Sequence, residues 1–304
     1  MQRPKLLTIS GPTAVGKTSF AIALAKQLNC AILSSDARQF YKEMHIGTAV
    51  PTDQEQKAVP HYFIQHKSIH NLYTVGDFER ESISLLKELF DKNNFAILVG
   101  GSNLYTNAVV NGLDEFPDVS TEIKRDWQQA FEQNGIAYLQ DELKRLDATY
   151  YTTVDLNNHV RLLRALAVCT ASGKPYSSFL GQPKKERDFD VVSIEITMPR
   201  EKLYTRINTR VDKMVANGLI EEVRGLLSYR NLNALQTVGY RELFPFFEVK
   251  EPLDKCIENI KKNTRRFAKR QLTWLRNHPC MYQIPYNTNI DEKLLKKLGL
   301  EKLG

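Results

Sequence analysis

Eight consecutive residues near the start of the chain have the types and spacing of a phosphate-binding loop. Gly11 and Gly16 are separated by four residues, and Lys17 and Thr18 follow directly. In such a loop, glycines let backbone N–H groups close around phosphate oxygens, a lysine adds a mobile positive charge, and a threonine hydroxyl can ligate Mg²⁺. We therefore expect a phosphorylated ligand to be bound by Gly11, Pro12, Thr13, Ala14, Val15, Gly16, Lys17 and Thr18.

The elements on either side of this loop are those that the motif requires. The apolar residues 6–10 predict a buried strand before the loop, and residues 17–28 have the spacing of a helix after it. The positive end of the helix dipole would favour an anion at that point. The motif leaves two classes of protein open: a P-loop kinase or nucleotide hydrolase, and a transferase that holds a diphosphate leaving group.

Short apolar runs alternate with amphipathic stretches over the first 115 residues. Further strands are expected at 31–35 and 95–99, and a long helix at 74–92. Strands that alternate with helices indicate βαβ units, which form a parallel sheet. The predicted fold class is therefore α/β, a P-loop NTPase-like parallel sheet flanked by helices.

The alternation stops at residues 113–118. From Ser120 to about Leu180 the spacing predicts helices and no strand, with one helix starting at Ser120 and another over 158–171. An apolar strand returns at 191–196. We expect an α/β core formed by 1–115 and completed by 186–304, interrupted by a helical insertion domain at 116–185. Plain sequential domains are the alternative.

Composition agrees with an ordinary globular protein. The chain has 304 residues, of which 42% are hydrophobic and 25% charged, enough to bury a sizeable core. Its four cysteines form no CxxC pair, which fits a reducing compartment and no zinc ribbon. No run approaches the roughly 20 apolar residues of a membrane span, and the N-terminus lacks the features of a signal peptide. We expect a cytoplasmic protein with no membrane segment.

Positive charge is concentrated in residues 255–276. This segment has eight Lys or Arg residues and one acid, Glu258, so its net charge of +7 equals that of the whole chain. At helical spacing, apolar residues fall on one face and basic residues on the other. A phosphate backbone fits such a basic face, whereas a membrane-surface helix and a solvated face without a partner are the alternatives. The basic residues of that face are Lys255, Lys262, Arg265, Arg266, Lys269, Arg270 and Arg276.

Asp36 follows the second predicted strand, at the edge where ligand sites gather in open α/β sheets. An acid at this point can also be a simple helix cap. Its surroundings carry a family resemblance: residues 34–41 are S-S-D-A-R-Q-F-Y and residues 44–51 are M-H-I-G-T-A-V-P. These strings resemble the signature of bacterial tRNA dimethylallyltransferases, also called tRNA isopentenyltransferases, which is usually D-S-R-Q-V-Y followed by M-D-I-G-T-A-K-P.

The resemblance extends over almost the whole chain. The other matching segments include 60–61, 73–78, 99–105, 161–166, 206–214, 218–223, 238–242 and 264–276. Four positions depart from the family pattern, namely Ala37, Phe40, His45 and Ser102, where the family usually has serine, a branched aliphatic residue, aspartate and threonine. Ser102 keeps the hydroxyl group, so its role should survive the change.

The resemblance implies a reaction and a set of catalytic residues. The donor would be dimethylallyl diphosphate, and the acceptor would be the N6 amine of the adenosine on the 3′ side of the tRNA anticodon. Asp36 is implied as the general base, and Ser102 as the hydroxyl that positions the amine. Either Arg206 or Arg210 would assist departure of the diphosphate, with Arg210 preferred. Mg²⁺ on Thr18 is the implied cofactor, and ATP would then be neither substrate nor cofactor.

The same resemblance implies a tRNA interface. The adenine would have to be extruded from the anticodon loop to reach the catalytic residues. For Arg161 and Arg164, which are three positions apart on a predicted helix, a surface ion-pair face is the alternative. The residues expected to contact tRNA are Asp36, Ala37, Arg38, Gln39, Ser102, Arg125, Val160, Arg161, Leu162, Leu163, Arg164, Gln236, Gly239, Tyr240, Arg241, Arg266 and Lys269.

The expected partner is the tRNA anticodon stem-loop, and we expect a monomeric enzyme. Two other functions stay open at the level of sequence. One is a P-loop kinase acting on a small molecule. The other is a prenyltransferase that modifies free adenine nucleotides, against which the basic helix and the helical insertion argue.

Overall fold

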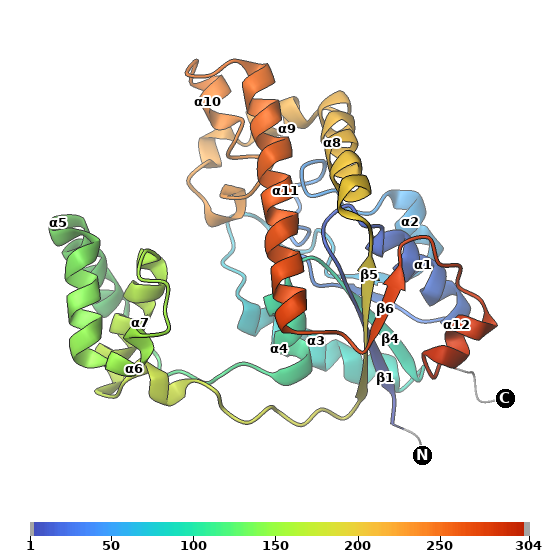
Figure 1. Ribbon diagram of the computed structural model, residues 1–304, viewed down its shortest axis with the longest axis horizontal. Coiled ribbons are helices and arrows are strands. Elements are labelled where there is room, and N and C mark those ends of the chain that lie inside the picture. Colours follow the sequence, from blue (N-terminus) through green and yellow to red (C-terminus); the bar gives the residue numbers. More distant parts are fainter. Residues whose placement is uncertain (1–2, 301–304) are drawn as a thin grey trace. The chain divides into compact units, whose positions relative to one another are not determined.

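The computed structural model describes residues 3–300, and its centre is a parallel β-sheet (Figure 1). The sheet has six strands in the order β3-β2-β4-β1-β5-β6, and every neighbouring pair is parallel. The predicted α/β, P-loop NTPase-like class is confirmed. The strands are β1 (Lys5–Ser10), β2 (Ile32–Ser34), β3 (His61–Tyr62), β4 (Phe95–Val99), β5 (Asp190–Thr197) and β6 (Tyr282–Pro285).

Helices cover both faces of this sheet. The α-helices are α1 (Lys17–Leu28), α2 (Asp53–Ala58), α3 (Val75–Phe90), α4 (Asn103–Asn111), α5 (Thr121–Leu146), α6 (Ala148–Tyr151), α7 (His159–Ser172), α8 (Arg200–Ala216), α9 (Leu219–Gly225), α10 (Phe244–Phe247), α11 (Leu253–Asn277) and α12 (Glu292–Lys297). Short 3₁₀ helices are η1 (Tyr176–Phe179), η2 (Leu227–Tyr229) and η3 (Asn233–Leu235). None of the helices in residues 3–300 combines the length and apolar character that a membrane span needs.

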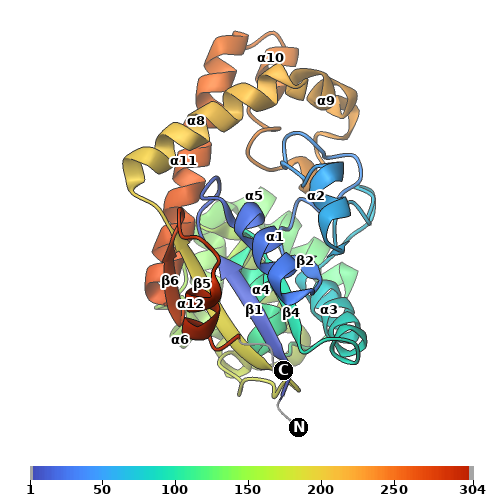
Figure 2. The same cartoon turned by 90° about the vertical axis from the view of Figure 1, so that its right-hand side faces the viewer.

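Successive side chains of a strand point to opposite faces of the sheet, and helices cover both faces of this one, so its strands need apolar residues at consecutive positions. Leu7 and Ile9 of β1 pack on the face covered by α1, whereas Leu6 packs on the face covered by α3 and α4 (Figure 2). Both faces are therefore buried, and a strand in this position is apolar throughout.

Most of the elements around the phosphate loop lie where the sequence predicts them. Helix α1 and strand β4 have the expected bounds, and α3 begins after Thr74, whose side chain forms a capping box with Asp77. Strands β3 and β6 were not predicted. They have two and four residues at the two edges of the sheet, too short for a periodic pattern to stand out.

The chain divides into two compact units, one of Met1–Asn111 with Glu186–Gly304, and the other of Gly112–Lys185. The second unit contains only helices, as the sequence predicts for 120–180. Ser120 caps α5, and Gly135 interrupts that helix with a positive φ of 75°. Helices α5 and α7 enclose a core of their own that includes Leu139, Leu162 and Tyr176.

In the first unit, the parallel register brings three loops to one edge of the sheet. Strands β1, β2 and β4 are adjacent or next-but-one neighbours, so the segments after Ser10, Ser34 and Val99 all leave from their carboxyl ends. Helices α8 and α11 pack against each other beside this edge. A ligand site at this edge is the expectation for an open parallel sheet.

Candidate active site

The phosphate loop is held in a strained but well-supported shape. Ala14 and Gly16 have positive φ values of 65° and 108°, which turn successive N–H groups toward one side. Gly11 packs so closely on β5 that a Cβ atom would lie 2.9 Å from the carbonyl oxygen of Ile196. Any larger residue at position 11 would push the loop away from the sheet.

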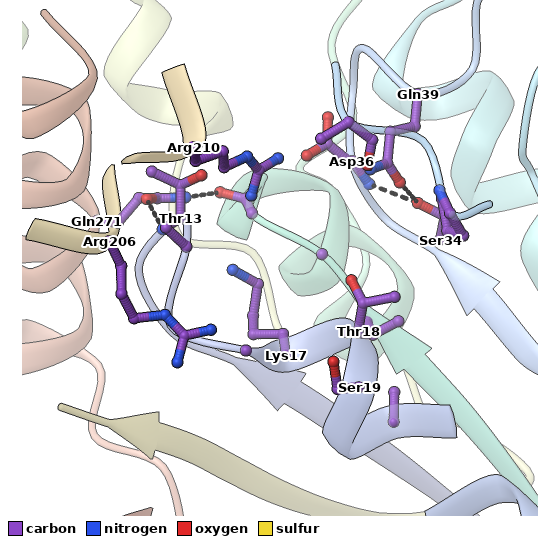
Figure 3. A pocket seen from close by; sticks show the side chains of 18 of the residues that line it. Thr13, Lys17, Thr18, Ser19, Ser34, Asp36, Gln39, Arg206, Arg210 and Gln271 are labelled. Carbon is purple, nitrogen blue, oxygen red and sulfur yellow. Dashed lines mark hydrogen bonds between the residues drawn. The ribbon is translucent and has the colours of Figure 1, made fainter. Parts of the chain in front are cut away.

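Five residues of the loop line a cavity of about 440 Å³ at the edge of the sheet. Figure 3 shows Arg206 and Arg210 of α8 on one side of this cavity, Asp36 on the other, and Lys17 between them. The loop residues in the lining are Thr13, Ala14, Gly16, Lys17 and Thr18. The other three expected phosphate ligands, Gly11, Pro12 and Val15, are buried and support the loop from behind.

The cavity is electropositive, and the protein itself neutralises little of that charge. Lys17 donates to the carbonyl oxygens of Gly11 and Pro12 at 2.9 and 3.0 Å. Burial lowers the pKa of its ammonium group to about 8, opposed by the nearby Asp36 carboxylate and reinforced by Arg210. Burial also lowers the pKa of Arg210, again against the effect of Asp36. An anion bound here would relieve both groups.

Asp36 and Ser102 are brought together although 66 positions separate them. The Asp36 carboxylate accepts from the backbone N–H of Arg38 at 2.9 Å, which shapes the turn after β2. The next residue, Ala37, donates its N–H to the Ser102 hydroxyl oxygen at 3.0 Å. The turn after β2 is thereby fastened to the N-terminus of α4.

A second cavity, of about 280 Å³, adjoins the first. Thr13, Asp36, Arg210 and Phe267 line both cavities, so Asp36 lies where the two meet. The remaining wall of the second cavity is largely apolar. It includes Ser102, Gly47, Thr48, Val211, Met214, Val238, Gly239 and Ile260.

The segment 45–49 that borders the second cavity is fixed from two sides. The Gln39 amide donates to the carbonyl oxygens of Thr48 and Ala49. On the other side, the carboxylate of Glu222 in α9 accepts three backbone N–H bonds from residues 45–47, at 2.7 to 3.1 Å. It also accepts from the Tyr240 hydroxyl at 2.6 Å. Neither Glu222 nor this network was predicted from sequence.

Tyr240, which was expected to contact tRNA, lies in the interior of the protein and not on its surface. Its side chain is fully buried, and its ring lies so close to Gly47 that a Cβ atom there would overlap it at 2.5 Å. Neighbouring Gly239 is buried and donates its N–H to Glu242. Gln236 and Arg241 are exposed, and Gly239 lines the second cavity, so of the four expected contacts in this segment only Tyr240 is confined to the interior.

The expected tRNA residues of the helical unit also divide by burial. Arg125, Val160, Arg161 and Arg164 are exposed. Leu162 is fully buried in the core of that unit, and Leu163 is partly buried. The guanidinium of Arg164 lies 5.0 Å from the centre of the Phe116 ring, a cation–π distance.

Helix α11 has the amphipathic form that the sequence predicts. Ile260, Ala268 and Leu275 are buried, whereas Arg266 and Lys269 are exposed. Within residues 3–300 neither Arg266 nor Lys269 forms an ion pair, in contrast to Lys261, which pairs with Asp212 and Glu258. Arg266 and Lys269 are therefore available to a polyanion.

One buried polar residue of α11 was missed by sequence reasoning. Gln271 is 4% exposed and lines the first cavity. At helical spacing it falls on the apolar face with Phe267 and Leu275, and a polar residue on such a face was the signal that could have found it.

The first cavity can accommodate Mg²⁺ together with a diphosphate. Thr18 offers a hydroxyl oxygen, a hard oxygen ligand of the kind that Mg²⁺ prefers. No group of three or more His, Cys, Asp or Glu side chains that could form an all-protein cage occurs in residues 3–300. A magnesium ion would therefore share its coordination with ligand phosphate oxygens, as is common for this cation.

Comparison with known proteins identifies the family. The family model described as IPP transferase matches residues 39–278, which is most of the chain. The chain belongs to this family. The family was predicted from the strings around Asp36, and that prediction is confirmed.

Individual relatives of the family agree over nearly their full length. The chain is 53% identical over 284 residues to the tRNA dimethylallyltransferase of Christiangramia forsetii, covering 93% of this chain and 94% of that one. It is 54% identical to the enzyme of the same name from Flavobacterium psychrophilum, over 277 residues and 89% and 90% of the two chains.

Solved structures extend the likeness to three dimensions. The tRNA isopentenylpyrophosphate transferase of Bacillus halodurans has a TM-score of 0.71 and 34% identity, covering 98% of this chain and 95% of that one. A eukaryotic dimethylallyltransferase, described as acting on tRNA, has a TM-score of 0.82 and 26% identity, covering 96% and 78%.

The lowered pKa of Lys17 predicts a pH dependence for diphosphate binding. As pH rises above about 8, Lys17 of the free protein becomes increasingly neutral. A bound diphosphate raises the pKa of Lys17, so binding takes up a proton in this range. The affinity advantage of the wild type over Lys17→Met should therefore shrink as pH rises through about 8. Calorimetric titration of inorganic diphosphate into both proteins measures this ratio, in which the titration of the ligand itself cancels. If the ratio of the wild-type affinity to the Lys17→Met affinity stays constant from pH 7 to above pH 9, the lowered pKa of Lys17 is contradicted.

Proposed function

We propose that this protein transfers the dimethylallyl group from dimethylallyl diphosphate to the N6 amine of the adenosine 3′-adjacent to the anticodon in tRNA, with release of diphosphate. Membership of the IPP transferase family supports this reaction. The observation that carries the chemistry is the position of Asp36, at the junction between a cationic cavity and a largely apolar one. A tRNA substrate would place the reaction in the cytoplasm.

The cationic cavity is suited to the diphosphate of the donor. The allylic C1–O bond breaks, and its electron pair leaves with the diphosphate oxygen. The loop N–H groups, Lys17 and the guanidinium groups of Arg206 and Arg210 surround the space where that charge develops. Both arginines line this cavity and Arg210 also reaches the second, which favours Arg210 as the group nearest the reacting carbon. Mg²⁺ held by Thr18 would supply further neutralisation of the leaving group.

Asp36 would act on the acceptor amine. An exocyclic adenine amine is a weak nucleophile, because its lone pair is shared with the ring. As the bond between N6 and C1 forms, one N6 proton must go to a base, and the Asp36 carboxylate accepts it. The Ser102 hydroxyl accepts from the Ala37 N–H at 3.0 Å, so its own proton stays free to orient a substrate atom.

The acceptor would be presented by RNA, since an unpaired loop base can be extruded into a protein at a cost of roughly a few kcal/mol. The exposed basic residues of α11, Arg266 and Lys269, would bind its phosphates. In the helical unit, Arg125, Arg161 and Arg164 are exposed and provide further positive charges.

A transfer assay tests the function directly. Purified protein with labelled dimethylallyl diphosphate, Mg²⁺ and unmodified tRNA should place label on the tRNA. AMP in place of tRNA should remain unlabelled, and γ-labelled ATP should donate no phosphate to small-molecule acceptors. Labelling of AMP but not tRNA would favour the free-nucleotide enzyme. Absence of prenyl transfer together with phosphorylation by ATP would establish a kinase instead.

Replacing Asp36 by asparagine isolates its role as a base. The amide keeps an oxygen for the Arg38 N–H, so the turn after β2 should hold, but it cannot take up a proton. We expect single-turnover transfer to fall by about 10²–10⁴-fold while the Kd for tRNA changes little. A variant that keeps more than about a tenth of the wild-type rate would remove Asp36 from this role.

The basic face of α11 predicts the salt dependence of tRNA binding. Replacing Arg266 and Lys269 together by alanine should weaken binding and reduce the slope of log Kd against log salt by about 2, since each lost phosphate contact removes about one. The matched control is Lys296→Ala with Lys297→Ala, which removes two exposed charges from α12. If both double variants have the wild-type slope, α11 lies outside the interface.

A further inference from the structure

The side-chain amide of Gln271 joins two neighbouring loops that both line the donor cavity, one after β1 and one after β4. Its oxygen accepts from the backbone N–H of Thr13 in the phosphate loop at 2.8 Å. Its nitrogen donates to the carbonyl oxygen of Gly101, also at 2.8 Å (Figure 3). Gly101 immediately precedes Ser102, so a single side chain connects the diphosphate loop to the segment that carries the Ser102 hydroxyl.

Few other side chains could make this connection. The Thr13 N–H can only donate and the Gly101 carbonyl can only accept, so the bridging group must offer one acceptor and one donor side by side. A primary amide does so without charge. A glutamate would lose the bond to Gly101 and add a negative charge beside the diphosphate, and an asparagine is shorter by one methylene group. Gln271 is only 4% exposed, which limits the competition of water for the two bonds.

The space around this bridge is tight on the side of Gly101. A Cβ atom at position 101 would lie 2.8 Å from the Gln271 nitrogen and 3.6 Å from an oxygen of Asp36. The φ angle of Gly101 is not in the positive region, so alanine is allowed there by the backbone. Glycine is therefore explained by the close approach of the Gln271 amide, and alanine would displace that amide.

We propose that Gln271 is a positioning residue that fixes the distance between the diphosphate loop and the Gly101–Ser102 segment. The proposal rests on the proposed function, because the two segments are those assigned to the donor and to the acceptor amine. Thr13 and Gln271 both line the donor cavity, and Thr13 and Asp36 line both cavities. The bridge thus sets where the donor's reacting carbon lies relative to Asp36 and Ser102, and a small displacement of reacting groups lowers a rate strongly.

The test is a double-mutant cycle on this one contact. Gln271→Met keeps the length of the side chain and removes both hydrogen bonds, and Gly101→Ala disturbs the same amide from its other side. We expect each variant to lower kcat for prenyl transfer by at least about tenfold and to raise the KM for dimethylallyl diphosphate, with the Kd for tRNA within about twofold of wild type. The double variant should lose no more than about twofold in kcat beyond the less active single variant, because Gln271→Met already removes the bridge that Gly101→Ala disturbs.

Diphosphate binding provides a second measurement that does not depend on catalysis, and thermal melting controls for folding. The affinity for inorganic diphosphate with Mg²⁺ should fall in Gln271→Met, whether or not tRNA is the acceptor. Thr273→Ala, an exposed position on the same helix, serves as the control for a general disturbance of α11. Thermal melting confirms that each variant is folded, and if Gln271→Met is not, Gly101→Ala carries the test.

The possible outcomes separate the two proposals. A wild-type protein that transfers no prenyl group would contradict the proposed function. The role of Gln271 could still be tested in that case, by comparing the diphosphate affinities of the wild type and Gln271→Met. If the wild type is active and folded Gln271→Met keeps its kcat, its donor KM and its diphosphate affinity within twofold, the positioning role is overturned. Losses that multiply in the double variant would also overturn it, because they would show two independent effects.

Discussion

The structure depends on a concentration of positive charge that the protein does not neutralise. Lys17, Arg206, Arg210 and Lys213 line one cavity, and among the described residues of its lining Asp36 is the only acid. Holding such groups together away from water is unfavourable, which is why the pKa values of Lys17 and Arg210 are lowered. The arrangement is stable because the buried apolar core of the sheet fixes α1 and α8, and it becomes favourable when a polyanion enters.

The chemistry follows from the way in which this cavity adjoins a less polar one. Asp36 lies at the junction and takes its position from the end of β2, the Asx turn to Arg38 and the bond from Ala37 to Ser102. A carboxylate between a cationic cavity and a more apolar one can face a charged leaving group on one side and an aromatic base on the other. The proposed reaction needs that arrangement, because a bond breaks on one side as a proton is removed on the other.

Side chains from distant segments hold the loops around the junction. Gln39 and Glu222 fix residues 45–49, and Gln271 ties the phosphate loop to Gly101. In each case a polar side chain satisfies backbone groups that would otherwise be solvated or mobile. Preorganised donors and acceptors of this kind need no rearrangement when the transition state forms. The polar residues buried in this part of the fold thus serve the geometry of the site.

The sequence by itself determined the fold class, the phosphate loop and the family. These depend on local patterns: glycine spacing, apolar runs and ordered strings such as the one around Asp36. The bounds of α1 and β4 could be predicted because the phosphate loop directly precedes α1 and a glycine pair follows β4. The short edge strands β3 and β6 could not, since two to four residues show no periodicity.

Tertiary structure alone decided which residues face the cavities and which support them. Tyr240 and Leu162 were expected at an RNA interface, yet both side chains are buried, because burial depends on contacts with segments far away in the sequence. The roles of Glu222 and Gln271 were hidden for the same reason: their partners lie far away in the chain, 176 positions from Glu222 to Ile46 and 170 from Gln271 to Gly101. A sequence shows that a glutamine is present on an apolar helix face, but only the folded chain brings to it one backbone donor and one backbone acceptor.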